Sequence, residues 1–80
     1  MNLSIVSIIE DIIFKNFKGV MYIEFKDNKH FNDLEVILHY ENYICKRIII
    51  PNADLNYFLN KEVNKFENYI NDLIKKASYY

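Results

Sequence analysis

The sequence predicts an α+β fold in which one helix, three antiparallel strands and a longer second helix follow one another. Three observations lead to this prediction. Apolar residues recur at helical spacing near both ends of the chain, apolar and polar residues alternate in the middle, and turn-forming residues separate these segments. We therefore expect residues 1–80 to form a single α-β-β-β-α domain. Its sheet is a three-stranded antiparallel meander, with the N-terminal helix and the long C-terminal helix packed on one face.

The first helix is expected from Leu3 to Phe17. Asn2 or Ser4 can cap its start, and Gly19 stands where a helix commonly ends. Its polar residues form one stripe, while apolar residues cover more than half of the helix circumference. Because three strands cannot cover that much apolar surface, part of it is expected to form a homodimer interface. The residues assigned to this interface are Leu3, Val6, Phe14 and Phe17.

Three strands are expected in the middle of the chain, at residues 20–26, 34–40 and 43–50. Residues 27–33 are rich in Asp and Asn and form the loop between the first two strands. Residues 41–42 form a tight two-residue turn before the third strand, where asparagine tolerates the positive φ that such a turn requires.

The third strand contains a conflict in its alternation. With Tyr43 paired to Tyr40, the isoleucines at even positions point away from the core. A β-bulge near Lys46-Arg47 would return Ile48 and Ile50 to the core, and we predict one there.

The second helix is expected from Ala53 to about Ala77. Pro51 ends the last strand, and Asn52 is a natural cap for the helix that follows. Apolar residues spaced three or four apart form a core-facing stripe along the whole helix. They are Leu55, Leu59, Val63, Phe66, Ile70, Leu73 and Ala77.

Composition and charge argue against several classes of protein. A net charge of −1 is poor support for a protein that binds nucleic acid mainly by neutralising phosphates. Cys45 is the single cysteine, so no internal disulfide is possible, which fits the reducing cytoplasm of a bacterial cell. The apolar N-terminal segment is interrupted by Glu10 and Asp11 and is too short to span a membrane.

No catalytic or cofactor-binding motif is found. The chain has one glycine and therefore no glycine-rich phosphate loop, and His30 and His39 lack the spacing of metal ligands on a helix. Cys45 is interpreted as an ordinary strand cysteine, since reactivity needs an activating neighbour. We expect no catalysis, no metal and no cofactor.

The stretch YIEFKDNKHFNDLEVIL, residues 22–38, resembles the strand–loop–strand of double-stranded-RNA-binding domains, which share the α-β-β-β-α order with HicA-type toxin ribonucleases. The resemblance implies that Lys29 and His30 in the loop would contact an RNA minor groove. The lysine cluster that opens the last helix of that family is missing here, where the helix opens with NADLNYFL. RNA binding is therefore the second hypothesis.

Two surfaces are candidates for a partner-binding site. One flank of the second helix carries asparagine, tyrosine and lysine without carboxylates, and adaptable recognition surfaces favour such residues. The other is the open face of the sheet, where large apolar groups are expected among charged residues that include Lys46. The expected contact residues are Tyr57, Asn60, Asn64, Asn68, Asn71 and Lys75 on the helix and Tyr22, Ile37 and His39 on the sheet.

The leading hypothesis is a small non-catalytic module that binds a host protein and inhibits it sterically. Arg47 is the only arginine among ten basic residues, and residues with AT-rich codons dominate the chain. Together with the small size, this composition indicates a phage or mobile-element protein from a low-GC bacterial host. An inhibitor of a bacterial defence nuclease, of the anti-CRISPR kind, is the specific form of the hypothesis.

Overall fold

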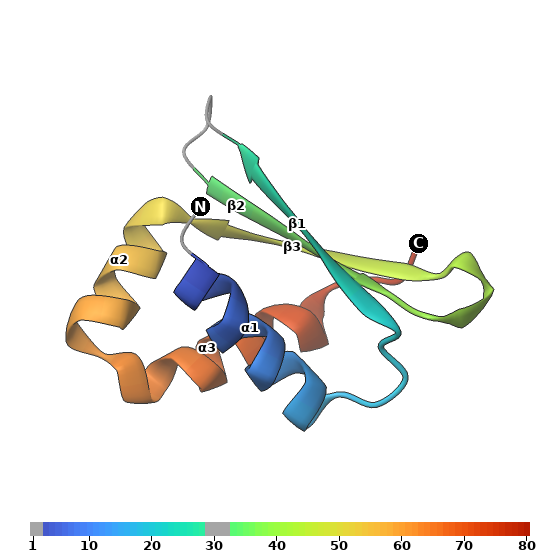
Figure 1. The fold of residues 1–80 in the computed structure, drawn as a ribbon, viewed down its shortest axis with the longest axis horizontal. Coiled ribbons are helices and arrows are strands. Elements are labelled where there is room, and N and C mark those ends of the chain that lie inside the picture. The colour runs from blue at the N-terminus through green and yellow to red at the C-terminus, as the bar shows by residue number, and fades with distance from the viewer. Residues whose placement is uncertain (1–2, 29–32) are drawn as a thin grey trace.

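The computed structural model describes residues 3–28 and 33–80, and it confirms the predicted α+β order (Figure 1). The elements are α1 (Leu3–Asn16), β1 (Tyr22–Asn28), β2 (Asp33–His39), a short 3-10 turn (Glu41–Tyr43), β3 (Cys45–Pro51), α2 (Asn52–Lys61) and α3 (Val63–Lys76). After α1, Gly19 adopts a φ of 87°, which glycine reaches without the strain a side chain would add.

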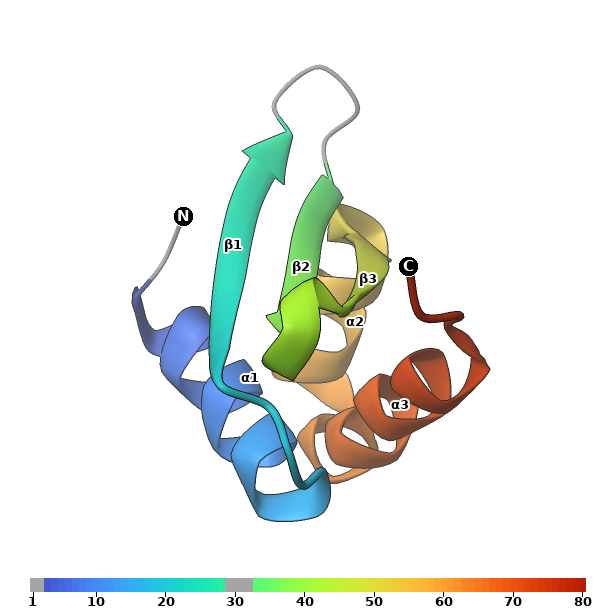
Figure 2. The same cartoon turned by 90° about the vertical axis from the view of Figure 1, so that its right-hand side faces the viewer.

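The three strands form one antiparallel sheet with β2 in the centre. Both strand pairs run without a break in register, so alternate residues of each strand face the same side. One side packs against all three helices (Figure 1, Figure 2). We call it the core face, and its buried apolar residues are Leu34, Val36, Leu38, Ile48 and Ile50.

The predicted β-bulge in the third strand is wrong. Register is continuous from Asp33↔Pro51 to His39↔Cys45. The conflict is resolved in the hairpin instead, where Tyr40 N donates to Ile44 O at 2.8 Å and three residues form the loop. The extra loop residue shifts the alternation by one, which brings Ile48 to the core face without distorting the strand.

The same shift corrects the predicted position of Lys46. Its side chain lies on the core side, not on the open face where it was expected, and it is 8% exposed. Lys46 Nζ donates to Ile74 O at 3.1 Å and lies 4.4 Å from the centre of the Tyr79 ring. The ammonium group therefore meets a carbonyl in the last turn of α3, where a positive charge is favoured.

The C-terminal residues return to the free edge of β3. Cys45 N donates to Tyr80 O and Tyr80 N donates to Cys45 O, both at 2.9 Å. The Tyr79 ring meets Tyr40 edge-on, with ring centres 5.4 Å apart. The pKa of Tyr40 is raised, mainly by burial and to a smaller extent by the neighbouring Tyr79. These contacts fix the hairpin end of the sheet to the end of α3.

The single long helix expected at 53–77 is wrong in its continuity. It breaks at Glu62, where φ is −137° and ψ is 50°, and α2 begins at Asn52 with Pro51 in the cap position. A straight helix of that length would extend roughly 37 Å and carry its apolar stripe beyond the sheet. The break lets both halves cover the core face, and Tyr69 Oη donates to Asp54 Oδ2 at 2.6 Å across the bend. Burial and this hydrogen bond raise the pKa of Tyr69.

Candidate functional site

The side of the sheet opposite the helices is the open face. Each of the three strands contributes one row of side chains to this face, and most of these side chains are charged or aromatic. The rows are Tyr22, Glu24 and Lys26 on β1, Glu35, Ile37 and His39 on β2, and Cys45, Arg47 and Ile49 on β3. Ile37 was expected to contact a partner, but it is only 6% exposed. None of the described helices packs on this face, so neighbouring side chains cover Ile37, and Arg47 Nη1 pairs with Glu35 Oε2 at 3.0 Å beside it.

His39 is the most connected side chain of the open face. Its ring stacks on Tyr22 at 4.2 Å between centres, with 7° between planes. Its Nε2 lies 3.0 Å from Glu24 Oε1, and its Nδ1 lies 3.3 Å from Cys45 Sγ. Three side chains therefore hold the ring: Tyr22 stacks on its face, and Glu24 and Cys45 each contact one of its nitrogen atoms.

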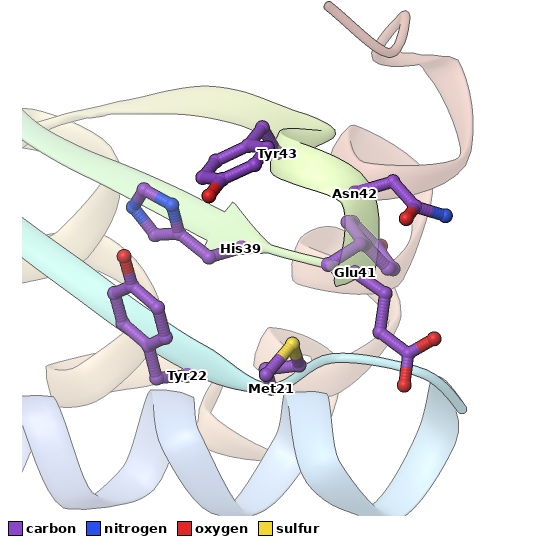
Figure 3. Close-up of a pocket in the computed structure, with 7 residues that line it drawn as sticks. Met21, Tyr22, His39, Glu41, Asn42 and Tyr43 are labelled. Atoms are coloured by element: carbon purple, nitrogen blue, oxygen red, sulfur yellow. The ribbon is translucent and has the colours of Figure 1, made fainter.

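A hollow of about 490 Å³ lies beside His39 at the hairpin end of the sheet. Its lining consists of Met21, Tyr22, His39, Tyr40, Glu41, Asn42 and Tyr43. Figure 3 shows the rings of Tyr22 and Tyr43 extending toward His39, while Glu41 and Asn42 point away from it. Met21, Tyr22 and Tyr43 are all exposed, so three large side chains surround one hollow. We call Met21, Tyr22, His39 and Tyr43 the hairpin patch.

Tyr43 has an unusual backbone conformation. Asn42 and Tyr43 both have a φ of 62°, and the Tyr43 side chain is 100% exposed. Asparagine tolerates this region and was expected to, but a bulky residue adopts it only at a cost. The three-residue loop thus holds a fully solvated tyrosine in an unfavourable conformation, and such outliers often mark functional positions.

The asparagine flank of the predicted long helix is divided by the bend at Glu62. Tyr57 and Asn60 lie on α2, whereas the remaining predicted contact residues lie on α3. These are Asn64, Asn68, Asn71 and Lys75. All six are exposed except Asn71, which is half-buried with an Oδ1 atom that has no hydrogen-bond partner in the described part of the chain. The flank is therefore two separate surfaces, and no hollow among those described is lined by it.

The residues assigned to a homodimer interface have different environments. Phe14 is exposed, Val6 is half-buried, and Phe17 packs against the core. Leu3 begins α1, and its side chain lies outside the description. Ile8 is also exposed, on another side of the helix from Phe14. The homodimer stays a prediction, with Phe14 and Val6 as its described apolar surface.

Lys29 and His30, the residues expected to contact RNA, lie outside the described residues. Within residues 3–28 and 33–80, no helix is long and apolar enough to cross a membrane. The same part of the chain contains no group of three or more His, Cys, Asp or Glu side chains placed to hold a metal ion.

Comparisons with models of protein families, with curated protein sequences and with solved structures found no match for this chain.

Sequence reasoning placed Tyr22 and His39 on the open face, where they lie. It missed Met21, Tyr43 and the contacts that Cys45 and Glu24 make with His39. The two-residue turn expected from the sequence pairs Tyr43 with Tyr40 and thereby puts Cys45 on the buried side, whereas the observed loop is one residue longer. The alternation of the third strand was the available signal, since a three-residue loop brings Cys45 and Arg47 to the face of His39 and returns Ile48 to the core face.

Proposed function

We propose that the protein is a small non-catalytic protein-binding module and that the hairpin patch is its main contact surface. The observation that carries the proposal is the clustering of Met21, Tyr22 and Tyr43, all exposed, around the hollow beside His39. Tyrosine supplies a large contact area at little conformational cost, and methionine adapts to irregular partners. A concave patch of this composition suits an apolar or aromatic anchor from another protein.

The conformation of Tyr43 supports a binding role. A left-handed backbone costs a bulky residue roughly 1–2 kcal/mol relative to its preferred conformations. Because the ring is fully exposed, it gains no stabilisation from burial within the chain that could offset this cost. Contact with a partner would bury the ring, which accounts for a tyrosine at a position where glycine or asparagine would be more stable.

The charges near the patch favour a protein over a nucleic acid. Glu24 and Glu41 lie close to it, and Lys26 is already paired with Glu24, with 3.8 Å between Nζ and Oε2. Phosphate backbones are bound by surplus positive charge. RNA binding through Lys29 and His30 remains the alternative, and the experiment below distinguishes it.

The finer proposal is that the partner is a host protein and that binding blocks one of its working surfaces. The small size and AT-rich residue usage support a phage or mobile-element origin. An inhibitor of a bacterial defence nuclease of the CRISPR kind fits that origin, and the cytoplasm of the host cell is where it would act. Dimerisation through Phe14 and Val6 is a separate proposal that the binding surface does not require.

The test is a comparison of matched variants in a pull-down from a low-GC bacterial lysate, followed by titration of any protein recovered. Tyr22→Ala and Tyr43→Ala each truncate an exposed tyrosine of the patch, and Tyr57→Ala truncates a tyrosine on α2 whose exposure, 50%, is close to the 56% of Tyr22. We expect the first two to weaken binding by roughly 2 kcal/mol or more and the third to leave it unchanged.

Two results would contradict the proposal. Loss of the partner only with Tyr57→Ala would transfer the site to the helix flank. Capture of RNA that disappears in Lys29→Ala and His30→Ala would favour the RNA hypothesis instead. The inhibitor proposal has its own assay, in which expression of the chain restores plasmid transfer in cells carrying an active CRISPR nuclease. Transfer that stays blocked while a host protein is still bound would reject only that finer proposal.

A further inference from the structure

Cys45, His39 and Glu24 form a continuous chain of polar contacts across the three strands. The sulfur lies 3.3 Å from one ring nitrogen of His39, and the Glu24 carboxylate lies 3.0 Å from the other. We propose that this chain is a proton relay that makes Cys45 a nucleophilic thiol, and that the site reacts with low-molecular-weight disulfides to form a mixed disulfide. A thiol, a base and a group that orients the base are the arrangement that activates cysteine nucleophiles.

The register of the sheet creates this chain. His39 and Cys45 are direct partners on β2 and β3. Both backbone groups of Cys45 bond to Tyr80, so its pair with His39 is the kind without mutual backbone hydrogen bonds. Side chains approach most closely in such pairs. Glu24 is paired with Ile37, which places it diagonally across from His39, within reach of its ring.

The contacts also decide which ring nitrogen receives the proton. An ionised carboxylate only accepts hydrogen bonds, so Nε2 carries the hydrogen that Glu24 accepts. The lone pair of Nδ1 then faces the sulfur and can accept its proton. The thiol and the carboxylate lie on opposite nitrogens of one ring, so these three groups form a line and do not converge on a common cation.

Neighbouring side chains hold the ring in this orientation. Tyr22 stacks flat against it, and an aromatic face favours the positive charge that the ring gains when it is protonated. The other charged groups on this face are Lys26, Glu35 and Arg47. Lys26 contacts the second oxygen of Glu24, and Arg47 pairs with Glu35, so Oε1 of Glu24 remains available to His39.

The proposed reaction balances without a further reagent. As Cys45 Sγ attacks one sulfur of the disulfide, Nδ1 of His39 takes its proton, a new S–S bond forms and the original S–S bond breaks. The leaving thiolate then takes the proton from Nδ1 and departs as a thiol. The formal oxidation state of the Cys45 sulfur rises by one and that of the released sulfur falls by one, so no other oxidant or reductant is needed.

Disulfide exchange fits this site better than acyl transfer. Acyl transfer requires donors aimed at a developing oxyanion, and the backbone donor of the cysteine itself, Cys45 N, is already bonded to Tyr80 O. Attack on a disulfide needs only an accessible sulfur and an acceptor for its proton. Cys45 is half-buried, so part of the residue remains accessible to a small disulfide.

The test is the rate at which glutathione disulfide adds to the purified chain, followed by intact mass. Cys45 is the only cysteine, so the added mass reports on this residue alone. At pH 7 we expect His39→Gln to slow the addition about 10-fold, because an unassisted thiol is already ionised to roughly a few per cent at that pH. Glu24→Gln should produce a smaller loss, because it removes the group that orients the ring. Glu35→Gln, on the same face but outside the chain of contacts, should leave the rate unchanged.

The pH dependence separates a proton relay from a structural effect. Above about pH 10 thiols ionise without a base, so the His39→Gln and wild-type rates should converge there. Equal rates for the two at pH 7 would overturn the proposal, as would a Glu35→Gln loss as large as that of Glu24→Gln. If His39→Gln does not fold by circular dichroism, the comparison of the two glutamate variants decides.

Discussion

The two faces of the sheet consist of alternate residues of the same strands, yet different forces order them. On the core face, burial alone orders residues such as Val36 and Leu38, which are completely buried. On the open face, order comes from specific pairs, in which His39 meets Tyr22, Glu24 and Cys45. Burial is nondirectional and depends only on alternation, whereas these pairs exist in one register only. The core face therefore follows from composition, and the open face follows from the exact pairing of the strands.

The largest effect is expected from two neighbouring isoleucines of β3 that face opposite ways. Ile48 is 4% exposed on the core face, and Ile49 is 45% exposed on the open face. Ile48→Ala should lower the free energy of unfolding by about 2–5 kcal/mol, because it leaves a cavity that the core fills only in part. Ile49→Ala should lower it by about 0.5 kcal/mol. Urea unfolding measures both.

Equal losses at the two positions would break the comparison between the faces. They would indicate that Ile49 is buried in solution, as a second copy on the open face would achieve. Light scattering on the wild-type chain at the same concentration would then reveal the oligomer.

Lys46 is the buried charged residue on the core side within the described part of the chain, and its contribution can be tested. Lys46→Ala should lower the free energy of unfolding by about 1–3 kcal/mol, because Ile74 O loses its buried donor. Lys26→Ala is the matched control on the open face, where an exposed ion pair contributes about 0.5 kcal/mol at most. Similar losses in urea unfolding for the two variants would mean that the Lys46 ammonium group is solvated.

The difference between the faces also explains which features of the fold could be predicted from the sequence and which could not. The order of elements and the core residues Leu55, Phe66 and Ile70 follow from periodicity, and they were predicted correctly. The assignment of Lys46, Cys45 and the supposed bulge depended on a single loop residue. Alternation has a period of two, so one misplaced residue reverses a whole strand. Local patterns do not determine hairpin length, because the contact of Tyr80 with Cys45 that supports this hairpin comes from the far end of the chain.

The bend at Glu62 has a similar origin. The apolar stripe from Leu55 to Ala77 fits one helix as well as two, and no proline or glycine marks the break. The bend is favoured by packing, since Leu55 on α2 and Phe66 on α3 both reach the same core. The sequence therefore places the asparagine flank on one helix, whereas the bend divides it between α2 and α3.

Tyr43 provides the next test, because its substitution should stabilise the fold and weaken binding. Tyr43→Asn should raise the free energy of unfolding by about 1 kcal/mol, since asparagine tolerates the left-handed region and the exposed ring has no burial to lose. Tyr43→Val is the matched control and should be destabilising, because β-branched residues are poorest in this conformation. Thermal or urea unfolding measures both. A Tyr43→Asn variant less stable than the wild type would mean that the ring makes stabilising contacts within the chain.

The smallest effect is expected from Glu67, whose exposed contacts extend the comparison to the helix layer. Glu67 Oε2 accepts from Asn16 Nδ2 at 2.9 Å and pairs with Lys15 Nζ at 3.1 Å, which links α3 to α1. The pKa of Glu67 is lowered below its usual 4.5, mainly by the hydrogen bond from Asn16 and then by the hydrogen bond from Lys15. A lowered pKa means that the folded chain favours the ionised form. The contribution to stability is therefore complete above pH 4.5 and is lost as the pH falls through the lower, folded value.

Glu67→Gln should consequently be slightly less stable than the wild type at pH 7, and this difference should shrink as the pH is lowered from 4.5 toward 3, as measured by urea unfolding across that range. Asp72→Asn, an exposed carboxylate change on the same helix, should leave this pH dependence unaltered. A wild-type advantage that persists undiminished at pH 3 would show that the side chain acts through its shape and hydrogen bonds. A polar contact at an exposed position would then contribute without its charge, and the contrast between nondirectional burial and specific pairing would extend to neutral groups.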